Sequence, residues 1–220
     1  MKNKITALLI LMVMTFSLMA QKSHKPFQLS LWNPVQIVNQ DLSVHGFRFN
    51  LIYGDNINMV GFDAGLVNVS RGYQEGAQFG IVNITEGPFT GARFGTVNIN
   101  EGTVIGYQRG IVNINHDGGK GWINGGVNVI EGDITGLVSG LVNVQHGKKM
   151  KGAMIGIVNV AEDSQPEKEK PGKIRRKGTQ IGIVNVTKSL KGVQIGLINI
   201  NKSARIKFFP FILISKKVKP

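Results

Sequence analysis

A short block of glycine, asparagine and branched apolar residues recurs along most of this chain. In each copy, glycine stands seven and three residues before an asparagine, and valine or isoleucine flanks that asparagine on both sides. Agreement at these positions in every copy marks a repeat array, in which a unit buries its apolar face only by stacking on its neighbours. The nine copies are GFDAGLVNV, GAQFGIVNI, GARFGTVNI, GYQRGIVNI, GWINGGVNV, GLVSGLVNV, GAMIGIVNV, GTQIGIVNV and GVQIGLINI.

The asparagines of these copies recur at nearly constant spacing. Successive intervals are 15, 15, 15, 15, 15, 16, 26 and 14 residues, and every change in length falls between an asparagine and the next glycine. Insertions therefore collect at one corner of the repeat, as expected for loops on one face of a stacked array. The nine residues are Asn68, Asn83, Asn98, Asn113, Asn128, Asn143, Asn159, Asn185 and Asn199.

The composition of the unit predicts an all-β fold. Glycine and β-branched residues disfavour helix and suit short strands joined by tight corners. Two architectures fit this pattern. The first is a parallel β-solenoid of about nine to eleven 15-residue coils with N- and C-terminal caps. The alternative is an up-and-down antiparallel β-barrel, in which each unit supplies one strand and one connection.

The recurring asparagine favours the solenoid. Equivalent residues of parallel coils lie directly above one another, about 4.8 Å apart, so each amide can donate to one neighbour and accept from the other. Each such bond contributes ~1 kcal/mol net, and an unpaired buried amide costs about 1–3 kcal/mol. Antiparallel neighbours gain nothing from identical residues. We therefore predict that the nine asparagines form a structural ladder and that the glycines occupy corners needing positive φ or close backbone approach.

The segments outside the array predict a leader, two caps and a loop. Lys2 and Lys4 precede an uncharged apolar run. That run is shorter than the ~20 residues of a membrane-spanning helix and is typical of a secretory signal peptide. Residues 162–177, rich in lysine, glutamate and proline, predict a mobile loop inside the array. The predicted division is 1–20 signal peptide, 21–60 N-terminal cap with degenerate repeats, 61–203 repeat array and 204–220 C-terminal cap with a basic tail.

The net charge of +13 is unevenly distributed along the chain. From Gln21 to Asn143 there are seven Lys or Arg and nine Asp or Glu, whereas from Val144 to Pro220 there are seventeen and four. Stacking would gather the cations of the last third on one edge, which would attract anions. The candidate anion-binding edge comprises Lys148, Lys149, Lys151, Lys173, Arg175, Arg176, Lys177, Lys188 and Lys191.

The expected partners of this edge are anionic. An envelope component (lipopolysaccharide, an acidic lipid or an acidic glycan) or a host surface molecule fits the charge and the predicted export. A specific nucleic-acid partner is not expected, because few aromatic residues lie among the charges.

No catalytic residue, metal or cofactor is expected. The absence of cysteine excludes disulfides, a thiolate zinc site and a cysteine nucleophile. The four histidines are scattered, and no GxSxG motif occurs. Glu86, Glu101 and Glu131 each follow an asparagine by three residues and would form a row in a solenoid. Because each coil supplies only one carboxylate, we interpret that row as a solvated edge, and we expect a protein that is not an enzyme.

The copies GAQFGIVNI, GTQIGIVNV and GVQIGLINI resemble the unit of bacterial surface-repeat proteins first grouped from leptospires. Those proteins share G-[LAV]-Q-[IF]-G-[LI]-[VI]-N-[IV] behind a signal peptide. The segments LSLWNPVQIVN, GFRFNLIYGDN and FFPFILIS are similar to that family's lead-in and ending. GWINGGVNV and GLVSGLVNV lack the glutamine, which indicates that it matters less to the structure than asparagine or glycine. The resemblance implies surface or outer-membrane association and no reaction.

Taken together, these features predict an exported, non-enzymatic surface-repeat protein at the cell surface or outer membrane, or else periplasmic or secreted. It would act as a binding or structural module of the cell envelope, using a β face and the basic C-terminal edge. The alternative is a small outer-membrane β-barrel of porin-like or adhesive type.

Overall fold

The structure is a computed structural model that describes residues 24–162 and 175–215. The predicted signal peptide, residues 163–174 of the predicted loop and the last five residues of the basic tail lie outside the described residues. Residues 175–177 were expected to belong to the loop, and this expectation is wrong. They begin strand β12, because they pair in register with β10.

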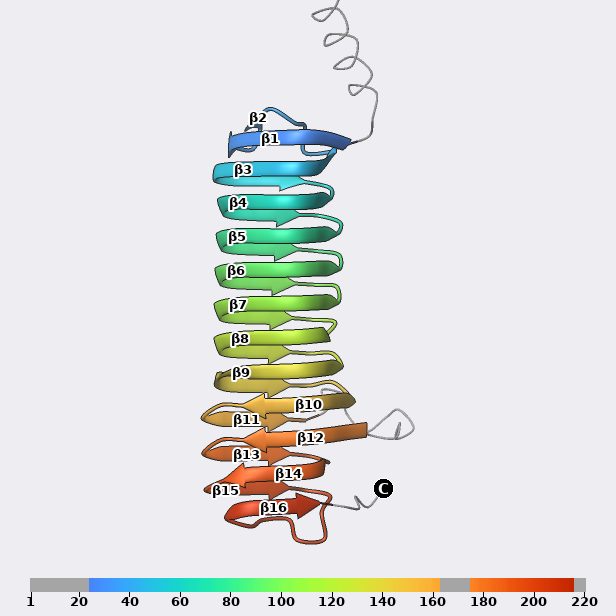
Figure 1. The fold of residues 1–220 in the computed structure, drawn as a ribbon, viewed down its shortest axis with the longest axis vertical. Coiled ribbons are helices and arrows are strands. Elements are labelled where there is room, and N and C mark those ends of the chain that lie inside the picture. The colour runs from blue at the N-terminus through green and yellow to red at the C-terminus, as the bar shows by residue number, and fades with distance from the viewer. Residues whose placement is uncertain (1–23, 163–174, 216–220) are drawn as a thin grey trace, which may run out of the picture.

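All helical or strand structure of the described residues is β-strand, and the strands follow one another along a single axis (Figure 1). The strands are β1 (His24–Trp32), β2 (Val35–Gln36), β3 (Ser43–Asn56), β4 (Met59–Ser70), β5 (Gln74–Thr85), β6 (Phe89–Asn100), β7 (Val104–Asn115), β8 (Gly119–Ile130), β9 (Ile134–Gln145), β10 (Lys149–Ile155), β11 (Val158–Ala161), β12 (Arg175–Ile181), β13 (Val184–Thr187), β14 (Lys191–Gly196), β15 (Ile198–Asn201) and β16 (Phe211–Ser215).

Consecutive repeats stack in parallel and in register. Asn83 of β5 lies opposite Asn68 of β4 on one side and Asn98 of β6 on the other. The same pairing of equivalent residues continues to β14 and β15, giving about eleven coils. The predicted parallel β-solenoid is therefore confirmed. The antiparallel up-and-down arrangement is not formed, because neighbouring repeats run in the same direction.

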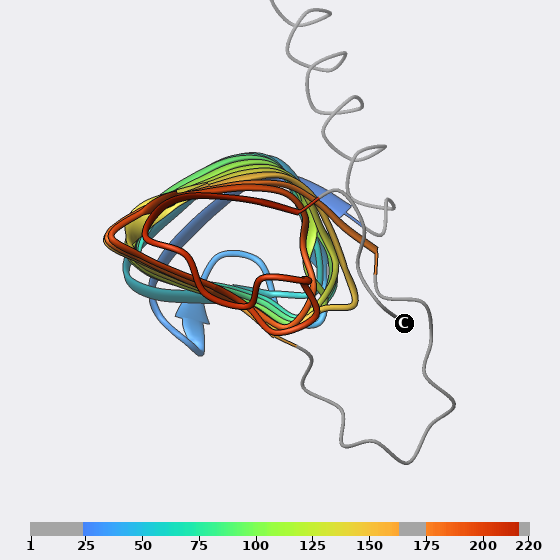
Figure 2. The same cartoon turned by 90° about the horizontal axis from the view of Figure 1, so that it is seen from below.

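Each coil bends sharply just before its asparagine. Positions are numbered here from that residue, so that in β5 Asn83 is position 0 and Gly80 is position −3. Backbone pairing between coils runs through position −3, omits position −2 and resumes at −1. Positions −2 and −1 therefore break the usual alternation of a strand, and the chain turns a corner there. Seen along its axis, the coil is a closed, flattened loop (Figure 2).

The glycine at position −7 is required by its backbone conformation. Gly91 has φ 135° and Gly106 has φ 126°, in a region that residues with a side chain rarely adopt. A Cβ on Gly106 would lie 2.0 Å from the carbonyl oxygen of Gly91 in the preceding coil. Positive φ and the close approach of the preceding coil therefore both require glycine at position −7. The prediction that these glycines need positive φ or close backbone approach is confirmed at this position.

The interior of the solenoid is largely polar at its N-terminal end. In β5 the buried side chains are Gln74, Gln78, Asn83 and Thr85, at positions −9, −5, 0 and +2. Because the asparagine points inward, the valine or isoleucine on either side must point outward. Stacking buries these branched residues only in part, so the expected apolar face of the repeat lies mostly on the outside.

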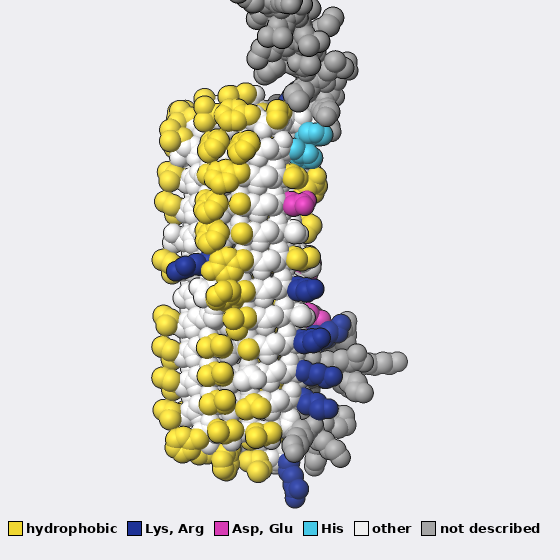
Figure 3. All heavy atoms as spheres, viewed as in Figure 1, with side chains coloured by type: hydrophobic (Ala, Val, Ile, Leu, Met, Phe, Trp, Pro, Cys, Tyr) yellow, Lys and Arg dark blue, Asp and Glu magenta, His cyan; other side chains and the backbone are white. Residues whose placement is uncertain are grey.

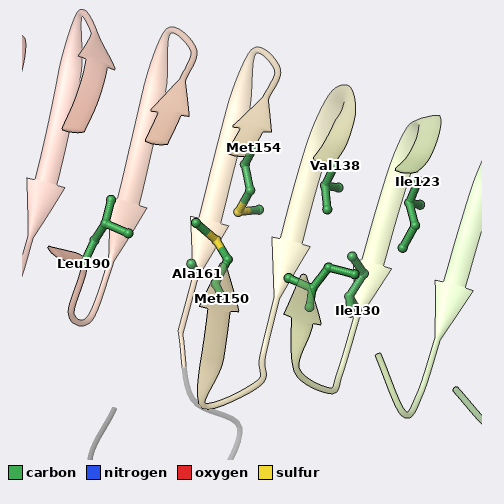
Figure 4. Packing of buried hydrophobic residues seen from close by; sticks show 8 residues of the cluster. Ile123, Ile130, Val138, Met150, Met154, Ala161 and Leu190 are labelled. Carbon is green, nitrogen blue, oxygen red and sulfur yellow. The ribbon is translucent and has the colours of Figure 1, made fainter. Parts of the chain in front are cut away.

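Further along, apolar residues replace the polar ones at the same interior positions. Ile123 and Val138 stand where β5 has Gln78, and Ile130 stands where it has Thr85. They belong to a buried cluster drawn from β8 to β11, together with Leu190, which lies just before β14 (Figure 4). Position −5, which carries glutamine in β5, therefore tolerates other residues, as predicted, whereas position 0 is asparagine in all nine copies. The cluster comprises Ile123, Ile130, Ile134, Val138, Met150, Met154, Ala161 and Leu190.

Both ends of the solenoid are covered. At the N-terminus, residues 37–42 turn across the open coil, and Val38 packs on Val44 and Met59 inside it. The backbone N–H of Val38 donates to Gln28 Oε1 at 2.6 Å. At the C-terminus, β16 runs antiparallel along the edge of β14. Each cap occupies an edge that would otherwise offer unpaired backbone groups to another chain.

Within the described residues, no helix is long and apolar enough to cross a membrane.

Candidate functional site

The asparagines form an unbroken hydrogen-bonded column inside the solenoid. Each side chain is fully buried. The Nδ2 group of each donates to Oδ1 of the asparagine in the next coil, at 2.7–2.9 Å from Asn68 through to Asn199. The predicted ladder is therefore present, with every member between the two ends both donating and accepting.

The second N–H of each amide binds the backbone. Asn83 donates to the carbonyl of Phe94, and Asn113 to that of Asn124, at 3.0 and 2.9 Å. These carbonyls are at position −4 of the next coil, beside the corner where backbone pairing is interrupted. In the later coils the same carbonyl also accepts the backbone N–H of the glycine at position −3 of the preceding coil, as that of Ile181 does from Gly156. The asparagine therefore adds a second hydrogen bond to this carbonyl and ties the side-chain column to the backbone at the corner.

The glycine at position −3 makes room for this column. A Cβ on Gly80 would lie 2.5 Å from Asn68 Nδ2 and 2.5 Å from Asn83 Oδ1. Gly110 is confined in the same way by Asn98 and Asn113. A side chain at this position would enter the hydrogen bond between two amides, so the asparagine and the glycine three residues before it form one structural requirement.

The ladder has one further member that the repeat pattern did not reveal. Asn50 Nδ2 donates to Asn68 Oδ1 at 2.7 Å, although the residue in register with Asn68 is Gly54. A Cβ on Gly54 would lie 1.8 Å from Asn50 Oδ1. The amide therefore reaches the column from a different backbone position, and a glycine fills the position it would have had.

Two buried arginines lie beside the ladder at the N-terminal end. Arg48 forms a bidentate ion pair with Asp63, with N–O distances of 2.8 and 2.7 Å, and Gln78 also donates to this carboxylate. Arg93 has no carboxylate partner in the part of the chain that the structure describes: it contacts Thr85, Asn100 and the ring of Phe89. Burial lowers the pKa of Arg93 to about 9. These groups are enclosed, so they fix the coils and are not exposed to a ligand.

The predicted basic edge is only partly assembled. Lys151, Lys177 and Lys191 occupy position −8 of β10, β12 and β14 and face one another in register. All three side chains are exposed, and neighbouring members are about 4.8 Å apart at the backbone. None forms an ion pair with a carboxylate of residues 24–162 or 175–215. We call these three residues the lysine row; cations gather along this edge in Figure 3.

Other members of the predicted edge lie elsewhere. Arg176 does not belong to it: the side chain is 1% exposed and points inward, where Nη2 donates to the carbonyl of Gly147 at 2.6 Å. The cause is strand alternation, since Lys177 beside it points outward. Lys149 is exposed but 3.6 Å from Asp133, and Lys188 is half-buried at position +3.

Three further cations of the predicted edge are Lys148, Arg175 and Lys173. The side chain of Lys148 is exposed. Arg175 pairs with Lys149 through the backbone, and Lys173 lies outside the described residues. One cation was missed: Lys120 has the same register position as the lysine row, separated from it by Thr135 of β9.

Position +3 carries a row of acidic and histidine side chains. Glu101, His116 and Glu131 are at equivalent positions of three successive coils. His116 Nδ1 is 2.7 Å from Glu131 Oε2, and its Nε2 is 3.6 Å from Glu101 Oε1. The hydrogen bond to Glu131 raises the pKa of His116 above 6.5, and Glu101 acts in the same direction. Among the described residues, no group of three or more His, Asp or Glu side chains could hold a metal ion.

No protein-family model, curated protein or solved structure matches the chain. The function must therefore be argued from the charged edge, the ladder and the outer faces of the solenoid.

We expect Asn113→Ala to destabilise the protein much more than Gln108→Ala. The first change leaves Asn98 Nδ2 without its side-chain acceptor and Asn128 Oδ1 without its donor in the buried interior, at about 1–3 kcal/mol each. Within the described residues the Gln108 side chain makes one hydrogen bond, to Asn113 Oδ1 at 3.1 Å, and Ile123 replaces it in the next coil. Thermal unfolding of the two variants measures the difference. Equal melting temperatures would contradict the structural role of the ladder.

We expect the pKa of His116 to fall when Glu131 is changed to Gln. The glutamate stabilises the imidazolium in the folded state, so the pair adds stability below pH 6.5, and this contribution disappears as pH rises through the folded-state pKa. Titration of the His116 ring followed by NMR gives both values. Glu86→Gln, at the same position two coils away, is the matched control and should leave the titration unchanged. An unaltered His116 pKa in Glu131→Gln would show that the contact is not maintained in solution.

Proposed function

We propose that this chain is an exported, non-enzymatic repeat protein of the cell envelope that binds an anionic envelope component through the lysine row. The observation that carries the proposal is the row itself: three exposed lysines stacked at one register position, without a carboxylate partner among the described residues.

Three stacked lysines repel one another unless negative charge lies nearby. Like charges directly opposite one another across strands destabilise a sheet, and stacking keeps Lys151, Lys177 and Lys191 in that arrangement. Closely spaced anionic groups, such as the phosphates or carboxylates of an envelope surface, would relieve the repulsion by lying along the row. A small isolated anion would meet only part of it.

The sequence outside the described residues supports export to the cell envelope. The basic start and short apolar run of residues 1–20 have the form of a secretory signal peptide. The resemblance to surface-repeat proteins points to the same compartment. A rigid stack of parallel coils fits a binding or structural role, since it presents identical positions at regular intervals.

We expect the variant in which Lys151, Lys177 and Lys191 are all changed to Gln to elute from beads coated with lipopolysaccharide at lower salt than the unmodified protein. Each lysine near an anionic surface contributes about 1 kcal/mol, and salt screens this attraction. The matched control changes Lys25, Arg109 and Arg205 to Gln, which removes the same charge from positions outside this edge.

Retention should fall sharply for the lysine-row variant and only slightly for the control. Equal loss in the two variants would show that total charge, not this edge, determines retention, and would contradict the proposal. Circular dichroism of both variants checks that the solenoid is intact.

A further inference from the structure

The outer surface of the last coils carries an apolar groove that neither the ladder nor the lysine row explains. Two parallel rows of branched side chains form its walls, one at position −4 and one at position −2, and its volume is about 770 Å³. The groove is shallow and open to the surface. Apolar side chains form continuous columns on this face in Figure 3. The wall residues are Ile155, Ile181 and Ile195 at −4 and Ile157, Ile183 and Leu197 at −2.

The floor of the groove is glycine backbone whose hydrogen bonds are already made. The N–H of Gly156 donates to the carbonyl of Ile181, and that of Gly182 to the carbonyl of Ile195, both at 2.9 Å. Asn199 Nδ2 donates to the carbonyl of Gly196 from inside. The same ladder that requires glycine at position −3 therefore leaves a smooth floor between the two walls. An occupant of the groove must itself be apolar.

One end of the groove is closed by β16. Phe211 lies opposite Gly196 and Ile212 opposite Ile195 in the antiparallel pair, and both line the groove. Phe211 has φ 67°, a left-handed conformation that is unusual for a bulky side chain. From Gly140 of β9 to Gly196 of β14 the groove crosses four coils, which span about 14 Å. One leaflet of a bilayer has a hydrocarbon thickness of about 15 Å, so the groove matches one acyl chain.

The strands that build the −4 wall also carry the lysine row. In β10, β12 and β14 a lysine at position −8 is followed four residues later by isoleucine at −4, about 13 Å along the strand. Between them lie Ala153, Thr179 and Val193, whose short side chains leave the surface low. Positive charge and an apolar groove therefore share one face.

We propose that this face binds an anionic lipid of a membrane surface, with its headgroup on Lys151, Lys177 and Lys191 and one acyl chain in the groove. The inference rests on the proposed anion-binding role of the lysine row and specifies its partner. A second copy of the chain fits less well. A two-fold axis along the solenoid would leave the lysines unused, and one across it would place the two lysine rows opposite each other.

The test compares binding of the full chain and its variants to vesicles of phosphatidylcholine with and without phosphatidylglycerol. Ile183→Asp puts a charge in the groove at an exposed position, so the fold should survive; Ile111→Asp makes the same change at the same register position outside the groove. We expect Ile183→Asp to weaken binding to the acidic vesicles about tenfold or more, since burying one isoleucine contributes about 1.5–3 kcal/mol. Ile111→Asp should bind like the unmodified protein.

A spin label provides a second measurement that does not depend on the charge change. Because the chain has no cysteine, Ile183→Cys and Ile111→Cys can each be labelled at a single site. The label at position 183 should lose access to a water-soluble relaxation agent when acidic vesicles are added, and the label at 111 should not.

The outcomes separate this inference from the function on which it rests. If Ile183→Asp binds acidic vesicles as well as the unmodified protein, while the lysine-row variant loses binding, the charged edge stands and the groove proposal is overturned. If the protein ignores acidic vesicles and sedimentation shows a dimer that Ile183→Asp dissociates, the groove belongs to a second copy and the proposal fails. If retention on lipopolysaccharide beads is also insensitive to the lysine row, the proposed function fails with it.

Discussion

One side-chain amide per coil holds this fold together. It binds its equivalent in the next coil and also the backbone carbonyl at the corner where strand pairing is interrupted. Only a side chain with two N–H donors and one acceptor at the right distance can make both bonds and accept a third. Because these partners are in the neighbouring coil, the amide fixes the parallel direction and the register of the stack together.

The outer surface follows from this constraint. An inward asparagine turns the branched residues beside it outward, and the close amide column limits position −3 to glycine. The solenoid therefore has a polar column inside and apolar rows outside, the reverse of an ordinary globular domain. Its long outer faces are suited to contact with an apolar or amphiphilic partner. Among the described residues, the lysine row and the groove occur together only in the last coils.

The repeat made the architecture and the ladder predictable, because four recurring positions could be explained together by parallel stacking. Three features could not be predicted from the repeat pattern. Asn50 enters the ladder from outside the repeat register, so its spacing gives no signal. Arg176 points inward because the strand begins three residues earlier than expected, inside the predicted loop. The groove depends on the corner at position −2, and residue spacing alone does not show which side chains diverge around a bend.

The hydrogen exchange of the asparagine side-chain amides, measured by NMR, tests the central claim most directly. Both N–H groups of Asn83, Asn98, Asn113, Asn128 and Asn143 should exchange as slowly as the backbone amides of the strands that carry them, because both are buried and hydrogen-bonded. Side-chain exchange at the rate of a solvent-exposed amide, with the backbone still protected, would contradict the account.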